Sequence, residues 1–106
     1  MNSIPVVALD PVREDVQAAY DYFEQRWRGA GERFIERYFA TTDRIALNPE
    51  TFAVKFDDYR RALVPRSNIA AYYFIEPQRA VVAAVVDARR NPRLIRQLVR
   101  GRRGNA

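Results

Sequence analysis

The feature that most constrains the fold is a nearly continuous apolar run close to the C-terminus, Ala80 to Val86 (AVVAAVV). Such a run is typical of a strand that is buried on both faces or lies centrally in a sheet. Two other β-rich runs precede it, Tyr59 to Val64 and Ile69 to Ile75. Short turns that contain proline separate the three runs, and connections of about four residues favour antiparallel pairing. We therefore expect a three-stranded meander.

The first half of the chain has helical periodicity instead. Residues 4–9 form a short β-branched strand, and from Pro11 to about Arg28 apolar residues recur at three- and four-residue steps. Gly29-Ala30-Gly31 interrupts this pattern, and a second helix from about Glu32 to Leu47 repeats it. So short a connection makes the helices antiparallel neighbours. The expected fold is α+β in the order β-α-α-β-β-β: an N-terminal strand and an antiparallel helical hairpin packed on a three- to four-stranded antiparallel sheet.

Length and composition bound the possible functions. A chain of 106 residues fits one domain, residues 1–106, with a basic and frayed tail at about residues 100–106. It contains no cysteine and no histidine, which excludes the usual zinc sites, Ser-His-Asp triads and Cys-His nucleophiles. No metal and no cofactor is expected. No run reaches the roughly 18 apolar residues of a membrane span, so the expected location is the cytoplasm, with no membrane partner.

The positive charge is concentrated at the C-terminal end. Residues 87–106 contain seven arginines and one acidic residue, Asp87, whereas residues 1–86 are nearly neutral. A polyanion or an acidic protein is therefore an expected partner. The bland alternative is genomic base composition, because seventeen of the eighteen basic residues are arginine. Within this end, the apolar residues of PRLIRQLVR recur with the period of a helix. Docking of such a helix on its own sheet or on a partner explains the pattern better than membrane-surface binding.

Several short motifs, taken in order, resemble the RelE/ParE toxin superfamily of bacterial type II toxin–antitoxin systems. YRRALV carries Arg60-Arg61 before a short apolar run, NIAAYYFI is a tyrosine-rich strand with Tyr72-Tyr73, and AVVAAVVDARRNP ends in Arg89-Arg90-Asn91-Pro92. The acidic, aromatic first helix (AAYDYFEQRW) and the second helix near GAGERFIERY agree as well. The resemblance covers about residues 4–93 and rests on the order of the motifs, since each is short and degenerate.

The resemblance implies one of two mechanisms. The mRNA endonucleases of the superfamily need acid–base groups around the scissile phosphate, but this chain has one lysine, no histidine and no tyrosine after Tyr73. Arginine cannot readily transfer a proton at neutral pH. The pattern favours the ParE branch, which the resemblance describes as a non-enzymatic inhibitor of DNA gyrase neutralised by a ParD-like antitoxin in a hetero-oligomer. A RelE-like ribosome-dependent mRNA endonuclease and a non-toxic basic nucleic-acid-binding module remain the alternatives.

No catalytic residue is assigned, and the candidate residues are those that could bind the target or the antitoxin. They are Arg60, Arg61, Tyr72, Tyr73, Arg89, Arg90, Arg93, Arg96, Arg100 and Trp27. Each has a structural alternative: Arg60 or Arg61 could pair with a nearby aspartate, one of the two tyrosines is expected in the core, and core packing is also favoured for Trp27. A DNA contact through the basic tail is a further expectation.

Overall fold

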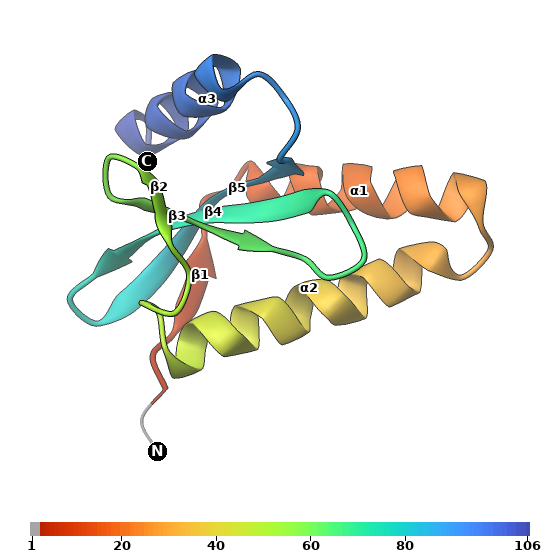
Figure 1. Cartoon of the computed structure of the whole chain (residues 1–106), viewed down its shortest axis with the longest axis horizontal. Coiled ribbons are helices and arrows are strands. Elements are labelled where there is room, and N and C mark those ends of the chain that lie inside the picture. Colours follow the sequence, from red (N-terminus) through yellow and green to blue (C-terminus); the bar gives the residue numbers. More distant parts are fainter. Residues whose placement is uncertain (1–2) are drawn as a thin grey trace.

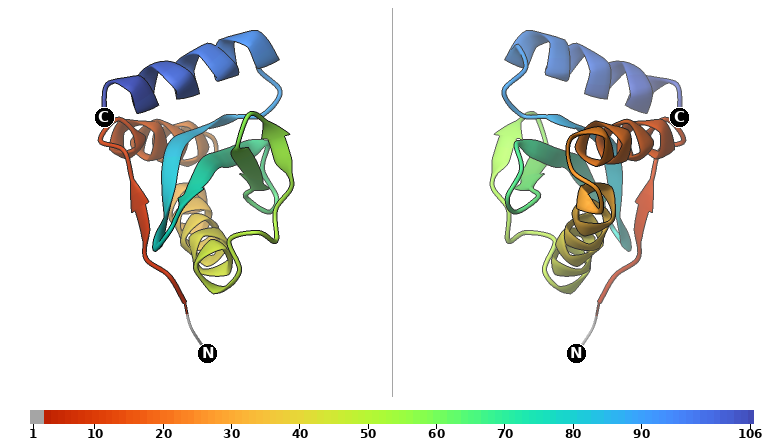
Figure 2. Two further views of the ribbon diagram at one scale, coloured as in Figure 1. Left: turned by 90° about the vertical axis from the view of Figure 1, so that its left-hand side faces the viewer. Right: turned by 90° about the vertical axis from the view of Figure 1, so that its right-hand side faces the viewer.

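The computed structural model describes residues 3–106 as one five-stranded sheet with helices on both faces (Figure 1). The elements are β1 (Val6–Ala8), α1 (Val12–Arg26), α2 (Ala30–Leu47), β2 (Val54–Phe56), β3 (Tyr59–Leu63), β4 (Ile69–Glu76), β5 (Arg79–Asp87) and α3 (Pro92–Gly104). Figure 2 shows α2 and α3 on opposite sides of the sheet. The predicted α+β class, the helical hairpin and the meander are confirmed.

The sheet differs from the prediction in size and in direction. Its strand order is β1-β5-β4-β3-β2, and β1 pairs with β5 in parallel, so the sheet is mixed and not purely antiparallel. Five strands replace the expected three to four. The additional strand, β2, has only three residues, of which Val54 and Lys55 are exposed. Three residues are too few for their alternation to identify a strand in a sequence.

Strand β5 is buried on both faces, as its apolar run predicts. Ala80, Val82 and Val85 face the helical hairpin, whereas the neighbouring side chains Val81 and Val86 face α3. The pairing with β4 shifts register between Tyr72 and Tyr73, which leaves Ala83 as an extra residue. Through this bulge Ala83 and Ala84 both face α3, where small side chains let the helix approach the sheet.

The helical hairpin covers the first face of the sheet with stacked aromatic rings. Phe23 of α1 lies on Phe34 of α2 with 5.3 Å between ring centroids, and Phe34 stacks in turn near Tyr38. The helices can approach because residue 31 is glycine: a Cβ there would lie 2.7 Å from the ring of Tyr20. Gly29, with a φ of +85°, lets the chain turn between the two helices, and Gly31 lets them pack closely.

Helix α3 covers the second face of the sheet. It continues to Gly104, so the expectation that the tail is frayed from about residue 100 is wrong up to that residue. The side chain of Asn91 accepts a hydrogen bond from the backbone N–H of Arg93 at 2.9 Å, and Pro92 follows at the first helical position, so the start of the helix is capped. Ile95 and Val99 are buried against the sheet. The predicted amphipathic helix therefore docks on its own sheet.

Three arginines at the end of α3 fasten it by ion pairs. Two of these ion pairs, Arg100–Asp57 and Arg103–Asp58, are largely exposed. The third pair, Arg102 with Asp15, is mostly buried, with side chains 16% and 11% exposed. The sequence suggests that the basic residues of the tail bind an acidic partner. Part of their positive charge is instead used in ion pairs within the fold.

The Arg102–Asp15 pair completes the edge of β5 where β1 ends. Strand β1 accompanies β5 only up to Val82, whose carbonyl accepts the N–H of Leu9. Beyond it, the carboxylate of Asp15 accepts the backbone N–H of Val85 at 2.9 Å, and Arg102 donates to the carbonyl of Ala83 at 3.1 Å. The two side chains replace a missing strand, since buried backbone groups need hydrogen-bond partners.

Replacing Arg102 with Ala should lower the free energy of unfolding by about 2 kcal/mol, because the mostly buried carboxylate of Asp15 loses its cationic partner and the carbonyl of Ala83 loses the hydrogen bond from Arg102. Urea unfolding monitored by circular dichroism gives this quantity. Arg100→Ala is the matched control: it removes the same side chain from the same helix, but its ion pair is about half exposed and contributes little. Equal losses in the two variants would contradict the role assigned to Arg102.

Candidate functional site

Two adjoining depressions lie between the helical hairpin and the ends of the strands. The first, which we call the arginine groove, runs between α1 and the end of β5; its lining includes Ala18, Tyr22, Arg66, Asn68, Asp87, Arg89 and Arg90. The second, which we call the tip cleft, lies under the α1–α2 turn and is lined by Phe23, Trp27, Ala30, Arg33, Phe34, Arg37, Pro65, Arg66 and Ser67. Phe23, Arg66 and Ser67 line both. The β3–β4 turn therefore forms a wall that the two depressions share.

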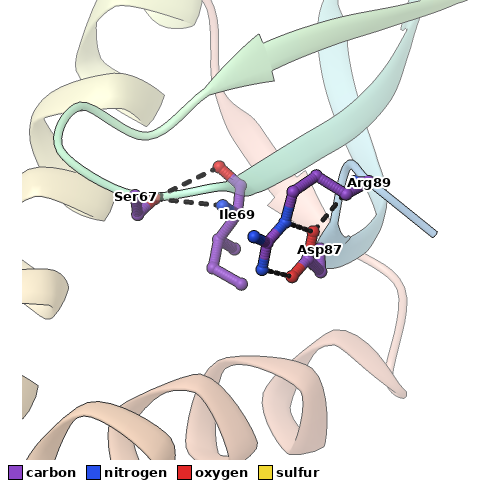
Figure 3. A network of polar contacts seen from close by, with 4 residues as sticks. All are labelled: Ser67, Ile69, Asp87 and Arg89. Carbon is purple, nitrogen blue, oxygen red and sulfur yellow. Dashed lines mark hydrogen bonds and ion pairs between the residues drawn. The ribbon is translucent and has the colours of Figure 1, made fainter.

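The β3–β4 turn holds Arg66 in an uncommon backbone conformation, with φ of +60°. The hydroxyl of Ser67 donates to the carbonyl of Val64 at 2.8 Å and accepts the N–H of Ile69 at 3.1 Å. The carbonyl of Asn68 accepts the N–H of Ala88, which ties the turn to the end of β5. Figure 3 shows Ser67 and Ile69 next to Arg89 and Asp87. A non-glycine residue at positive φ persists only where its surroundings fix it.

The end of β5 presents one paired and one unpaired arginine. Both carboxylate oxygens of Asp87 accept from the Arg89 guanidinium, at 3.1 Å from Nε and 2.8 Å from Nη2, and Oδ1 also accepts the backbone N–H of Arg89 (Figure 3). These bonds lower the pKa of Asp87 to about 2, so it stays ionised. Arg90 has no carboxylate partner within residues 3–106 and carries its charge openly.

The α1–α2 turn is built around Glu24. Its carboxylate accepts the N–H of Gly29 at 3.0 Å and the N–H of Gly31 at 3.0 Å, and Gly29 has a φ of +85°. These bonds lower the pKa of Glu24, because they favour its charged form. Trp27, in extended conformation directly after α1, projects from the turn with 73% of its surface exposed.

The sequence-predicted residues do not form one site. Arg89, Arg90 and Trp27 line the two depressions. The core packing favoured for Trp27 is wrong, since the stacked rings of Phe23 and Phe34 fill the space between the helices.

Tyr72 and Tyr73 both lie in the core, 3% and 0% exposed, because helices cover both faces of the sheet. The hydroxyl of Tyr73 donates to the carbonyl of Pro49 at 2.6 Å, and its neighbour across the sheet, Arg60, donates to the carbonyl of Phe52 at 2.8 Å. Both therefore fasten the segment that leads into β2. Arg61, opposite Tyr72 in register, is half-buried.

The remaining predicted arginines follow α3. Arg93 is exposed, Arg96 lies 6.0 Å from the ring of Phe56, and Arg100 pairs with Asp57. The aspartates suggested as partners of Arg60 and Arg61 are thus bound by α3 instead. Asp57 has a lowered pKa because Arg100 donates two hydrogen bonds to it.

Sequence reasoning missed Arg33, Arg37, Arg66 and Tyr22. Arg33 and Arg37 are one turn apart on α2 and look like part of a solvated helix face, whereas Arg66 stands in a turn. Linear spacing carries no signal that these elements meet. Among residues 3–106 there is no group of three or more acidic side chains that could hold a metal ion, and none of the described helices is long and apolar enough to cross a bilayer.

The fold matches a known structure. The chain aligns with a chain from the structure titled "Chromosomal ParDE TA system from P. aeruginosa" at a TM-score of 0.68, over 80% of this chain and 96% of the other. The chain has a ParE-like fold. Sequence identity is 10%, so the likeness shows a shared fold. No family model matches the sequence, and no curated protein is significantly similar to it.

Replacing Glu24 with Gln should lower the urea midpoint at neutral pH, because a neutral amide oxygen accepts the N–H groups of Gly29 and Gly31 less strongly. The native pKa of Glu24 lies below its ordinary 4.5, so the stabilisation is complete above that pH and is lost as pH falls through the native pKa. The difference between wild type and variant should therefore shrink in acid. A difference that is constant with pH would show that the charge of Glu24 does not hold the turn.

Proposed function

We propose that this chain is the toxin of a type II toxin–antitoxin system that inhibits DNA gyrase in the cytoplasm and is neutralised by a cognate ParD-like antitoxin. The observation that carries the proposal is the fold match, which spans 96% of a chain from a ParDE system. The ordered motifs around Arg60-Arg61, Tyr72-Tyr73 and Arg89-Arg90 support it independently of that match. A fold alone does not imply a function, so the side chains decide between the two mechanisms of the superfamily.

The chemistry of the depressions favours inhibition over RNA cleavage. Cleavage needs a group that gains and loses a proton near neutral pH. The ionisable groups that line the arginine groove are arginines, Tyr22 and two aspartates, Asp15 and Asp87, both held by arginines. Burial raises the pKa of Tyr73, which moves it further from neutrality. An RNA bound here would find positive charge without an acid–base partner.

The surface offers two kinds of attachment to an antitoxin. Strands β1 and β2 are the edges of the sheet and can accept an additional strand. On the hairpin, Phe39 and Leu47 of α2 are more than half exposed, which provides two apolar contacts for an amphipathic helix. Because the toxin has a net charge of +5, the antitoxin segment that covers it should be acidic.

Expression of the chain without its antitoxin should stop growth with filamentation and an SOS response, and co-expression of the neighbouring antitoxin gene should restore growth. The purified protein should inhibit gyrase supercoiling and should not cleave ribosome-bound mRNA, because loss of general acid–base groups typically costs about a hundred- to ten-thousand-fold in rate. Cleavage in the ribosomal A site that disappears in Arg61→Ala would contradict the proposal and favour the endonuclease. No phenotype at all would favour a non-toxic nucleic-acid-binding module.

The proposed DNA contact through the basic end should depend on Arg93 and Arg96, which have no carboxylate partner in the described part of the chain and lie one turn apart on α3. The double variant Arg93→Ala/Arg96→Ala should unfold like wild type. Its inhibition of supercoiling should weaken less steeply with salt, because each lost phosphate contact lowers the logarithmic salt slope by about one. The double variant Arg13→Ala/Arg79→Ala is the control of equal charge, because it removes two exposed arginines that lie on α1 and at the start of β5. Unchanged salt dependence would assign these arginines to solubility alone.

A further inference from the structure

The tip cleft combines an apolar floor with a cationic rim. Phe34, which is 2% exposed, forms the floor together with Phe23 and Pro65, and Arg33, Arg37 and Arg66 stand around it. Trp27 projects at its end. Figure 1 shows the α1–α2 turn at the opposite end of the molecule from β1 and β2, so the cleft is remote from both edge strands.

The residues of the cleft are held before any partner arrives. The Glu24 carboxylate binds Gly29 and Gly31 and so fixes the turn that carries Trp27. On the other side, Ser67 and Asn68 fix the β3–β4 turn, and Arg66 keeps its positive φ of 60°. A strained residue held by its surroundings points to a local function, and side chains on rigid supports lose little entropy on binding.

The positive charge of the rim is uncompensated. Over residues 3–106, no carboxylate forms an ion pair with Arg33, Arg37 or Arg66. Glu24 interacts electrostatically with Arg33, but its oxygens already accept the backbone N–H groups of the turn. Arginine and tryptophan are enriched in the hot spots of protein interfaces. Three guanidinium groups beside an exposed indole therefore indicate a binding surface for a partner.

From these features we infer that the tip cleft is a docking surface for an acidic peptide segment of a partner protein, in which carboxylates flank an apolar side chain. The carboxylates pair with Arg66 and Arg37 at the rim, and the apolar side chain lies on Phe34 against Trp27. A nucleic acid fits less well, because its backbone needs continuous positive charge, whereas the floor is apolar and the adjoining arginine groove contains the carboxylate of Asp87. This inference does not depend on gyrase being the target.

Trp27 is the only tryptophan of the chain, so its fluorescence reports on the cleft. A short acetylated peptide that alternates Glu and Leu is the probe. On binding it should shift the emission to shorter wavelength and reduce quenching by acrylamide. The binding should weaken as salt is added, because it includes charge pairs.

Two variants separate binding from folding. Arg66→Gly removes the guanidinium and relieves the positive φ, so its melting temperature should stay close to that of wild type while the peptide affinity falls about two- to five-fold. Trp27→Ala, followed by anisotropy of a labelled peptide, should reduce affinity by about ten-fold or more without a loss of stability, because the side chain is exposed. Arg13→Ala, an exposed arginine of α1 that lines a different groove, is the matched control.

Retention of affinity in Arg13→Ala together with its loss in Arg66→Gly and Trp27→Ala would support the inference. Equal losses in Arg13→Ala and Arg66→Gly would show unspecific charge attraction and overturn it. Tighter binding of an oligothymidylate of the same charge would overturn it in favour of a nucleic-acid surface. Absence of any Trp27 response to the peptide would overturn it as well.

Discussion

The structure depends on one ion pair that joins three layers. Asp15 comes from α1, Arg102 from α3, and both bind the backbone of β5 between them. Each partner alone would be a buried charge without compensation, and the open edge of β5 would be a row of unsatisfied groups. Together they let β1 remain three residues long. The same pair turns the end of a basic tail into part of the fold and orients α3 over the second face of the sheet.

Sequence patterns identified the parts of the fold that local periodicity determines. The two helices of the hairpin, β3 to β5 and the amphipathic character of α3 follow from runs long enough to show a period. The parallel pairing of β1, the short β2 and the bulge at Ala83 depend on contacts between distant segments, which no local pattern contains.

The candidate site was only partly predictable for the same reason. Arg89 and Arg90 could be found because they end a recognisable strand. Arg66 could not, since its position depends on a turn meeting two helices that precede it in the chain. The tyrosines show the same limit: strand alternation predicts one of Tyr72 and Tyr73 in the core, but both lie there, because α3 covers the second face of the sheet.

The parallel pairing of β1 with β5 also determines the order in which parts of the native structure can form. Val6 pairs with Ala80, and Asp15 meets Arg102 across 87 residues of sequence, so the decisive contacts have a very high sequence separation. Formation of such contacts is slow, because the loop between them must close first. A chain still emerging from the ribosome can form the helical hairpin but lacks the last strand and the closing arginine. The native structure therefore forms only once the segment from β5 to Arg102 is available, later than the helical hairpin.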